Sequence, residues 1–223
     1  MPESESPEQS IASSRTSSTS TQSTIGTSLL SKTLSSSEKN PSNLVSSHEE
    51  VERISNECIV NAYNLVWEQK KYARALVVLQ YALKLQRSFW GKHHKDVGYT
   101  CNFIATTYWL QGEDLNSAMR YILEARRIMC KLLNKSTSSQ QEESENYGQS
   151  TGPLLQGIDD RIHCILVKFR LPESDIQRAK EAIDRTISHE LYGDRLKEQG
   201  YTEAAKEQYQ HARKVSAVLR LLM

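Results

Sequence analysis

The chain lacks a charge excess and a long apolar run, and each absence excludes a class of protein. Lys and Arg number 28 against 27 Asp and Glu, so bulk charge does not indicate a nucleic-acid-binding protein. The most apolar stretch, residues 73–85, is interrupted by Arg74, Gln80 and Lys84, whereas a membrane span needs roughly 18 to 20 apolar residues. We therefore expect neither a nucleic-acid partner nor a membrane span.

Paired cysteines and a targeting signal are also lacking. The absence of any CxxC pair indicates reduced thiols in the interior rather than disulfides, and the four cysteines are Cys58, Cys101, Cys130 and Cys164. The chain begins with Glu3, Glu5 and Glu8 among its first residues, whereas a secretory signal begins with positive charge and a transit peptide has few acids. We therefore expect a cytoplasmic protein.

Residues 1–48 contain no aromatic side chain and are dominated by 17 Ser and 6 Thr. Such a segment cannot bury enough apolar surface to offset the entropy lost on ordering. We predict a disordered Ser/Thr-rich tail over residues 1–48 and one folded domain over residues 49–223.

The folded part contains an internal repeat with an offset of 43 residues. Small residues fall on small residues and apolar residues on apolar ones, without a gap, at eight positions. The pairs are Cys58 and Cys101, Ala62 and Ala105, Leu65 and Tyr108, Tyr72 and Leu115, Ala75 and Ala118, Leu79 and Ile122, Ala82 and Ala125, and Leu85 and Ile128. We predict two repeated units within residues 49–134.

Each unit has the apolar spacing of two helices separated by a break. In the second unit, Gly112 is placed to end the first helix, and Asp114 to cap the second. Gly91 and Asp96 have the corresponding places before that unit's first helix. The alanines of both units allow close approach of antiparallel helices, which larger side chains would prevent.

These positions resemble the tetratricopeptide repeat, whose small, Tyr, small, aliphatic and Ala positions match Ala105, Tyr108, Ala118, Ile122 and Ala125. The segment GKHHKDVGYTCNFIATTYWLQGE resembles the variant found in kinesin light chains, although Lys95 stands where that variant usually has Pro. The likeness concerns the repeat type only, because no heptad-bearing coiled coil precedes the two units. It implies an all-α stack of helical hairpins.

The remaining residues predict a loop and a helical C-terminus. Residues 135–155 are polar and indicate a flexible loop. Over residues 156–223 we expect a short amphipathic helix, a long helix that Ser174 and Gln177 open as a capping box, and a diverged third repeat. About seven helices result. The last two also resemble the end of a microtubule interacting and trafficking domain, which is a three-helix bundle.

Catalytic motifs are absent from the sequence: it has neither a glycine-rich phosphate loop nor a nucleophile elbow. The candidate metal ligands are His93 with His94 and His163 with Cys164. Neighbouring side chains on a helix point about 100° apart and rarely bind one ion together. We predict no catalytic residue, no cofactor and no metal site, and therefore not an enzyme.

The resemblance implies a partner-binding groove lined by the first helix of each unit. Its facing residues are Tyr63, Val66, Trp67, Tyr99, Asn102, Thr106, Trp109 and Leu110. Trp and Tyr offer large contact area at low entropic cost, but Trp67 and Trp109 are equally consistent with packing against the C-terminal helices. A second candidate binding site is a basic patch, which could bind an acidic motif of a partner or could simply be a solvated helix face. Its residues are Arg120, Arg126, Arg127 and Lys131.

Together these features predict a non-catalytic adaptor or scaffold that binds a peptide or helix of another protein in this groove. Two alternatives stay open. One is a structural subunit that packs permanently within a larger complex, and the other is a trafficking protein with a microtubule interacting and trafficking-like bundle at its C-terminus.

Overall fold

The computed structural model describes residues 48–138 and 145–222, and all regular structure in these ranges is α-helical. This confirms the predicted all-α class. The described residues belong to one unit, Asn40–Met223. The Ser/Thr-rich tail falls on residues outside the described ranges, apart from His48, which begins the first helix.

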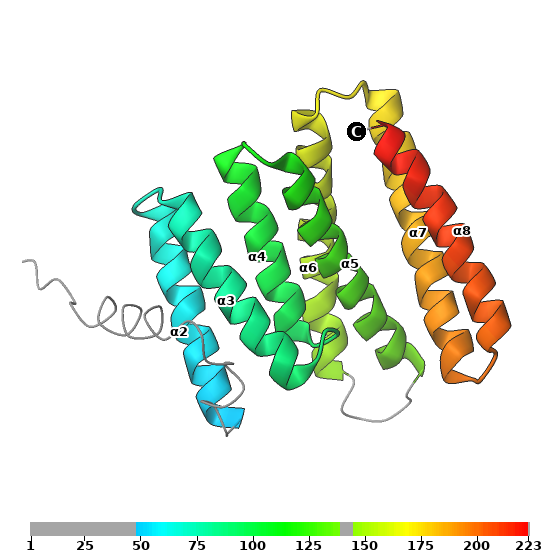
Figure 1. The fold of residues 1–223 in the computed structure, drawn as a ribbon, viewed down its shortest axis with the longest axis horizontal. Coiled ribbons are helices and arrows are strands. Elements are labelled where there is room, and N and C mark those ends of the chain that lie inside the picture. Colours follow the sequence, from blue (N-terminus) through cyan, green and yellow to red (C-terminus); the bar gives the residue numbers. More distant parts are fainter. Residues whose placement is uncertain (1–47, 139–144, 223) are drawn as a thin grey trace, which may run out of the picture. The chain divides into compact units, whose positions relative to one another are not determined.

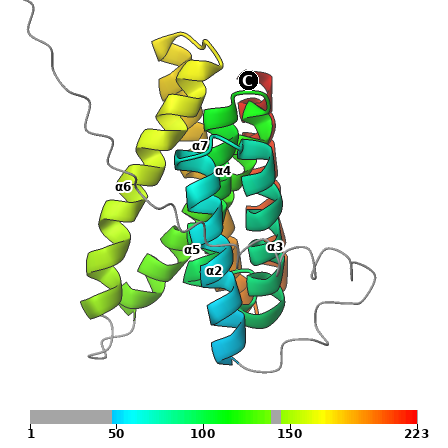
Figure 2. The same cartoon turned by 90° about the vertical axis from the view of Figure 1, so that its left-hand side faces the viewer.

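Seven helices lie in the described ranges, as the periodicity predicted. They are α2 (His48–Trp67), α3 (Tyr72–Trp90), α4 (Lys95–Gln111), α5 (Leu115–Ser138), α6 (Glu145–Lys168), α7 (Glu173–Glu198) and α8 (Thr202–Leu222). From α2 to α6 each helix packs on the next, and α7 packs on α8 (Figure 1). Figure 2 shows α3 and α6 on opposite sides of α2 and α4. No helix in the described ranges is long and apolar enough to cross a membrane.

The core follows the 43-residue repeat. The repeated alanines of α2 and α3 are fully buried, and so are their equivalents in α4 and α5. Leu79 and its equivalent Ile122 are completely buried as well. The small residues let α2 approach α3, and α4 approach α5, while the larger side chains fill the space between the paired helices. The two hairpins are therefore built on the same pattern of small and large side chains.

Turns between these helices are set by glycine and by polar caps. Gly91 and Gly112 have φ of 81° and 80°, a conformation that glycine adopts without strain, and each follows the last residue of a helix. The Asp114 carboxylate accepts a hydrogen bond from Ser117 N at 2.8 Å, so this predicted cap is confirmed. The prediction for α4 was wrong, because His94 is its N-cap and Nδ1 accepts from Asp96 N at 3.3 Å.

The C-terminal half differs from the prediction at two helix starts. Helix α6 begins at Glu145, so much of the expected loop 135–155 is helical, and it continues through Pro153. An apolar face of α6, which includes Ile158 and Ile162, packs on α5, and this tertiary packing stabilises the helix. Helix α7 begins at Glu173 behind Pro172 without a side-chain cap, so the predicted capping box does not form.

The third hairpin consists of α7 and α8. Gly200 has φ of 88° in the turn between them, and Ala205 and Ala212 of α8 are buried. Helix α6 follows the second hairpin in sequence and packs mainly on α5, with smaller contacts to α4 and α7. Because α6 packs mainly on α5, it does not join α7 and α8 in a compact three-helix bundle.

Candidate partner-binding surface

An apolar stripe runs along α2. Val60, Tyr63 and Trp67 follow one another at intervals of three and four residues, which places them on one face of the helix. Their exposed fractions are 62%, 55% and 41%. The rings of Tyr63 and Trp67 lie 6.1 Å apart, and Lys70 Nζ lies 5.7 Å from the centre of the Trp67 ring. Exposed aromatic and aliphatic side chains grouped on one helix face have the chemistry of a contact surface.

Helix α4 contributes fewer accessible groups than predicted. Tyr99 is 41% exposed, whereas Asn102 and Leu110 are half-buried. Thr106 is buried and donates its hydroxyl to the Asn102 carbonyl at 2.9 Å. The Asn102 side-chain oxygen is shielded from solvent and has no hydrogen-bond partner within the described part of the chain. Tyr99 is therefore the exposed group of α4 on this surface, and Asn102 contributes an unpaired but shielded oxygen.

Val66 of α2 is completely buried, and so belongs to the core with Thr106 rather than to an open groove. It follows Ala62 by four residues, so it lies on the same buried helix face. Trp67 lies about 100° further round the helix and is exposed. Adjacent residues of one predicted surface thus fall on opposite sides of the boundary between core and solvent.

Trp109 is covered by α6. Lys168 Nζ lies 4.8 Å from the centre of its ring, and the Arg161 guanidinium lies 5.7 Å from it. Lys168 also donates to the Trp109 carbonyl oxygen at 2.5 Å, near the C-terminus of α4. Trp109 therefore packs against the C-terminal part of the chain, while Trp67 stays accessible.

Arg161 is a half-buried cation that lies against the ring of Trp109. Burial lowers the pKa of its guanidinium, and an electrostatic interaction with Cys164 acts in the opposite direction. Its Nε is shielded and has no hydrogen-bond partner among the residues that the structure describes. Lowering of an arginine pKa by burial reflects an unfavourable environment for its charge, which an incoming carboxylate would relieve. Arg161 and Lys168 were missed as candidates, although their spacing of seven residues places them on one face of α6.

The predicted basic patch of α5 is already occupied. Arg126, Arg127 and Lys131, which we call the cationic face of α5, pair with carboxylates of α6 and α7. Arg120, the fourth residue of the predicted patch, instead lies with its guanidinium 5.1 Å from the centre of the Tyr121 ring. The patch thus separates into an exposed residue and an intramolecular interface.

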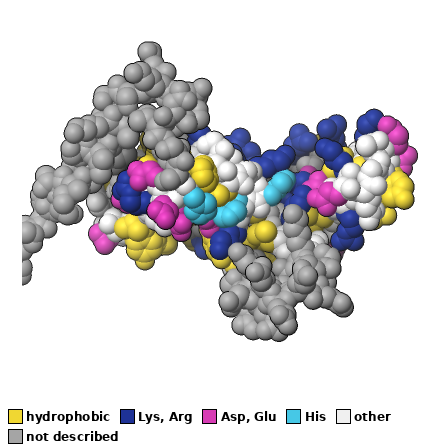
Figure 3. All heavy atoms as spheres, turned by 90° about the horizontal axis from the view of Figure 1, so that it is seen from below, with side chains coloured by type: hydrophobic (Ala, Val, Ile, Leu, Met, Phe, Trp, Pro, Cys, Tyr) yellow, Lys and Arg dark blue, Asp and Glu magenta, His cyan; other side chains and the backbone are white. Residues whose placement is uncertain are grey.

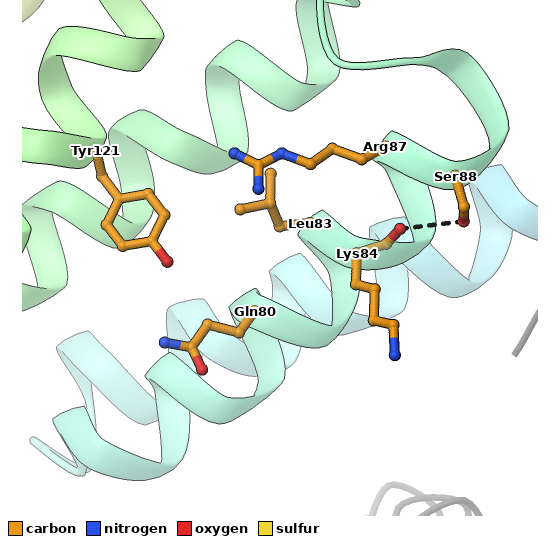
Figure 4. A pocket seen from close by; sticks show the side chains of 6 residues that line it. All are labelled: Gln80, Leu83, Lys84, Arg87, Ser88 and Tyr121. Atoms are coloured by element: carbon orange, nitrogen blue, oxygen red, sulfur yellow. Dashed lines mark hydrogen bonds between the residues drawn. The ribbon is translucent and has the colours of Figure 1, made fainter. Parts of the chain in front are cut away.

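A shallow depression of about 590 Å³ lies between α3 and α5 (Figure 4). Gln80, Leu83, Lys84, Arg87 and Ser88 of α3 line it together with Tyr121 of α5. In Figure 4 the Arg87 side chain extends toward the side where Tyr121 stands, and it pairs with Glu124 at 2.5 Å. This ion pair joins α3 to α5 at the depression.

Histidine and aromatic side chains meet where α2 begins and α3 ends. Trp90 lies 5.7 Å from the His48 ring and stacks on His94 at 5.0 Å. Figure 3 shows histidines at the surface of this end of the molecule, near charged groups. Burial and the charges of Lys131, Arg127 and Lys92 lower the pKa of His93. The described residues contain no group of three His, Cys, Asp or Glu arranged to hold a metal ion.

Cys58, Cys101 and Cys130 are not activated thiols, because burial raises the pKa of each. Burial is the main cause that raises the pKa of Cys58 to about 11 and that of Cys101 to about 12. A thiol with so high a pKa is a poor nucleophile near neutral pH. All four cysteines are free, and Cys164 is exposed.

The exposed part of the candidate surface therefore consists of the apolar stripe of α2 and Tyr99 of α4, while Asn102 of α4 and Arg161 of α6 are half-buried polar groups without a full set of partners. Helices α2, α4 and α6 run in the same direction, so Trp67, Trp109 and Lys168 all lie in final turns at one end of the helices (Figure 1). Comparison with known proteins adds no precedent for this arrangement: no family model, no curated protein and no solved structure matches the chain.

Proposed function

We propose that the chain is a non-catalytic interaction module, a tetratricopeptide-like stack that binds a peptide or helix of a partner protein along α2 and α4. One observation carries this proposal: Val60, Tyr63 and Trp67 form a continuous exposed apolar stripe on α2. Rigid aromatic side chains that remain exposed contribute much of the binding energy at protein interfaces. A solvated helix face would instead carry charged side chains at these positions.

The chemistry of the surface suggests the kind of peptide that would bind. Tyr63 and Trp67 fit an apolar side chain of the ligand. The unpaired oxygen of Asn102 is shielded in this structure, so it would accept from a peptide N–H only if ligand binding exposes it. Arg161 would favour an acidic residue, because a carboxylate would compensate a charge that burial now destabilises. We therefore propose a ligand segment with an apolar anchor and a nearby acidic residue.

The test is a peptide-display selection on the full-length chain, followed by measurement of Kd for the selected peptides by fluorescence anisotropy. Replacing both aromatic residues, as Tyr63→Ala with Trp67→Ala, should weaken binding at least about tenfold, the effect expected for loss of interface anchors. Arg161→Gln should weaken binding of acidic peptides and leave neutral peptides unaffected. Circular dichroism at 222 nm verifies that each variant is folded.

A matched control is Tyr192→Ala, which removes an aromatic residue of similar exposure from α7, away from α2. This control should bind the peptides as the unmodified chain does. If the double variant of α2 binds the selected peptides with unchanged Kd, the proposed surface is wrong.

A structural subunit is the second candidate, and the end of α8 favours it. Val218 and Leu221 lie one turn apart near the C-terminal end of α8, and their exposed fractions are 49% and 87%. An obligate subunit buries such residues against its neighbour. Light scattering of the purified chain separates the candidates, because a stable monomer at micromolar concentration contradicts an obligate subunit. The trafficking alternative receives no support from α6, which packs mainly on α5.

A further inference from the structure

The C-terminal hairpin, α7 with α8, is built differently from the two hairpins before it. Within the hairpin the helices approach closely: a Cβ added at Gly193 would lie 2.8 Å from Cε1 of Tyr209. Ala179, Ala182 and Ile183 of α7 are buried. Toward the rest of the chain, in contrast, α7 contacts α5 and α6 only sparsely. The hairpin is therefore well packed internally but weakly joined to the helices before it.

Ion pairs cross the junction between α5 and α7. Arg126 lies 2.6 Å from Asp184, and Arg127 lies 2.7 Å from Glu190. Lys131 lies 2.9 Å from Asp194. Further pairs join Arg127 to Asp194 at 3.1 Å and Lys131 to Glu198 at 3.7 Å. Three of the carboxylates, at positions 190, 194 and 198, are spaced four residues apart, so they form one acidic stripe on α7.

Asp194 lies at the centre of this interface. It accepts hydrogen bonds from Lys131 at 2.9 Å and Arg127 at 3.1 Å, and a third from the Tyr209 hydroxyl at 2.7 Å. Burial acts to raise the pKa of its carboxyl, but these hydrogen bonds and the two cationic charges outweigh burial and lower it. The interface thus stabilises the ionised carboxylate and recognises negative charge.

The connection between α6 and α7 is short and contains a strained residue. Arg170 has φ of 59°, unusual for a residue other than glycine, and Pro172 precedes α7. The link spans only residues 169–172. A rotation confined to these residues would move the C-terminal hairpin away from α5 as a unit, without breaking the packing between α7 and α8.

We propose that the cationic face of α5 is a docking surface for an acidic helix, which α7 occupies within this chain and an acidic helix of a partner protein takes when the C-terminal hairpin is released. The partner helix would carry carboxylates four residues apart, as α7 does. This surface is separate from the aromatic stripe of α2, so the inference goes beyond the proposed peptide-binding function and can be tested independently of it.

The balance of interactions makes release feasible. The carboxylates of Asp184 and Glu198 are largely exposed, so their pairs contribute little stability and weaken as salt screens them. The pair of Lys131 with Asp194 is mostly buried and is the main polar contact that release must break. The tethered helix, however, competes at an effective concentration on the order of millimolar. A partner helix should therefore bind weakly to the closed chain and more tightly once α7 has lost its carboxylates.

Cys130 provides a built-in reporter of the α5–α7 junction. It is half-buried on α5, next to the cationic face, and the carboxylate of Asp184 contributes to its electrostatic environment. Its rate of alkylation, followed by mass spectrometry of the full-length chain, should rise severalfold between about 0.05 M and about 0.5 M salt. Buried Cys101 should stay protected at both salt concentrations, which verifies that the first two hairpins remain folded.

The binding experiment uses a fluorescent peptide with the sequence of residues 176–199 and an open variant, Asp184→Asn with Glu190→Gln and Asp194→Asn. The open variant should bind the peptide at least about tenfold more tightly than the unmodified chain, because the tethered competitor is weakened. Adding Arg126→Gln, Arg127→Gln and Lys131→Gln should abolish this gain. A control that neutralises exposed acids elsewhere on the hairpin, Glu173→Gln with Glu181→Gln and Glu207→Gln, should behave as the unmodified chain.

Three results would overturn the proposal. Equal peptide affinity of the open variant and the control would show that α7 does not block the surface. Binding that survives loss of the three cations would place the peptide elsewhere. An oligonucleotide of equal charge that binds the open variant as tightly as the peptide would show that the surface does not recognise an acidic helix. If the open variant unfolds, the salt dependence of Cys130 alkylation decides, and an unchanged rate contradicts release.

Discussion

Gly193 packs closely against the Cδ1–Cε1–Cζ side of the Tyr209 ring. A Cβ at position 193 would approach Cε1 of that ring to 2.8 Å and Cδ1 to 3.1 Å. The Tyr209 hydroxyl is meanwhile held by Asp194, the neighbour of Gly193 on α7. The ring cannot tilt away from an added methyl group without loosening this hydrogen bond, so a small residue at 193 is a requirement of how α7 and α8 pack.

Gly193→Ala should therefore lower the free energy of unfolding by about 1–2 kcal/mol, because overpacking outweighs the better helix propensity of alanine. The matched control is Gly157→Ala in α6, where a Cβ would meet nothing within 4 Å. This control should raise stability by about 0.5–1 kcal/mol. Urea unfolding followed by circular dichroism measures both variants. A neutral or stabilising Gly193→Ala would contradict the close approach of α7 and α8.

The 43-residue repeat predicts equal responses at equivalent positions. Ala82 and Ala125 are both fully buried where paired helices approach. Replacing either by Leu should cost about 1–3 kcal/mol through overpacking, since the two residues have similar helix propensities. Ala204→Leu, on the exposed surface of α8, is the control and should change stability by less than about 0.5 kcal/mol. If Leu destabilises the chain at only one of the two buried sites, the hairpins do not share one packing pattern.

Much of the first two hairpins could be predicted from the sequence, because their determinants are local or periodic. Ala75 and Ala118 lie on the buried face that the repeat requires. Gly112 ends a helix since it adopts positive φ at no cost, and Asp114 caps the next helix through its own side chain. Each of these features depends on only a few neighbouring residues.

The candidate surface was harder to predict because its exposure depends on tertiary packing. The 43-residue offset aligns Trp67 with Leu110 and Trp109 with Val66, so the repeat alone does not show which tryptophan is covered. Only Trp109 is, by Lys168 and Arg161 of a helix more than 50 residues later. The polar residues from Glu145 onward have the composition of a loop. They are helical because they extend, toward the N-terminus, a helix whose apolar face packs on α5. Pairing of the cationic face of α5 likewise required knowledge of where α7 lies.

Lys168 is expected to stabilise the C-terminus of α4. It donates to the Trp109 carbonyl and lies over the same residue's ring, so Lys168→Met should lose a charged hydrogen bond and a cation–π contact. The expected cost is roughly 1–2 kcal/mol, discounted because Lys168 is exposed. Lys214→Met on the exposed side of α8 is the control, with little expected effect. Urea unfolding monitored by tryptophan fluorescence measures the effect. Equal unfolding midpoints for Lys168→Met and the unmodified chain would show that the contact of Lys168 with Trp109 does not stabilise the fold.

His93 should make the fold less stable in mildly acidic solution. Burial, and then the charges of Lys131, Arg127 and Lys92, lower the pKa of its imidazole in the folded chain, whereas Asp194 acts in the opposite direction. In the unfolded chain the imidazole titrates near its ordinary value of about 6.5, so the unfolded state binds more protons just below that pH. The contribution of the neutral His93 to the free energy of unfolding is therefore fully present above about pH 6.5, and it is lost as the pH falls through the lower pKa of the folded state.

Thermal unfolding of the chain between about pH 8 and about pH 5 measures this decrease. His93→Gln cannot take up the proton and should flatten the curve over this interval, while His211→Gln on the exposed side of α8 should keep the slope of the unmodified chain. If the unfolding temperature of the His93 variant depends on pH as steeply as that of the unmodified chain, another group causes the effect. A stability that rises toward pH 5 would mean that the pull of Asp194 exceeds burial and the three cations, so that the folded chain favours the protonated imidazole.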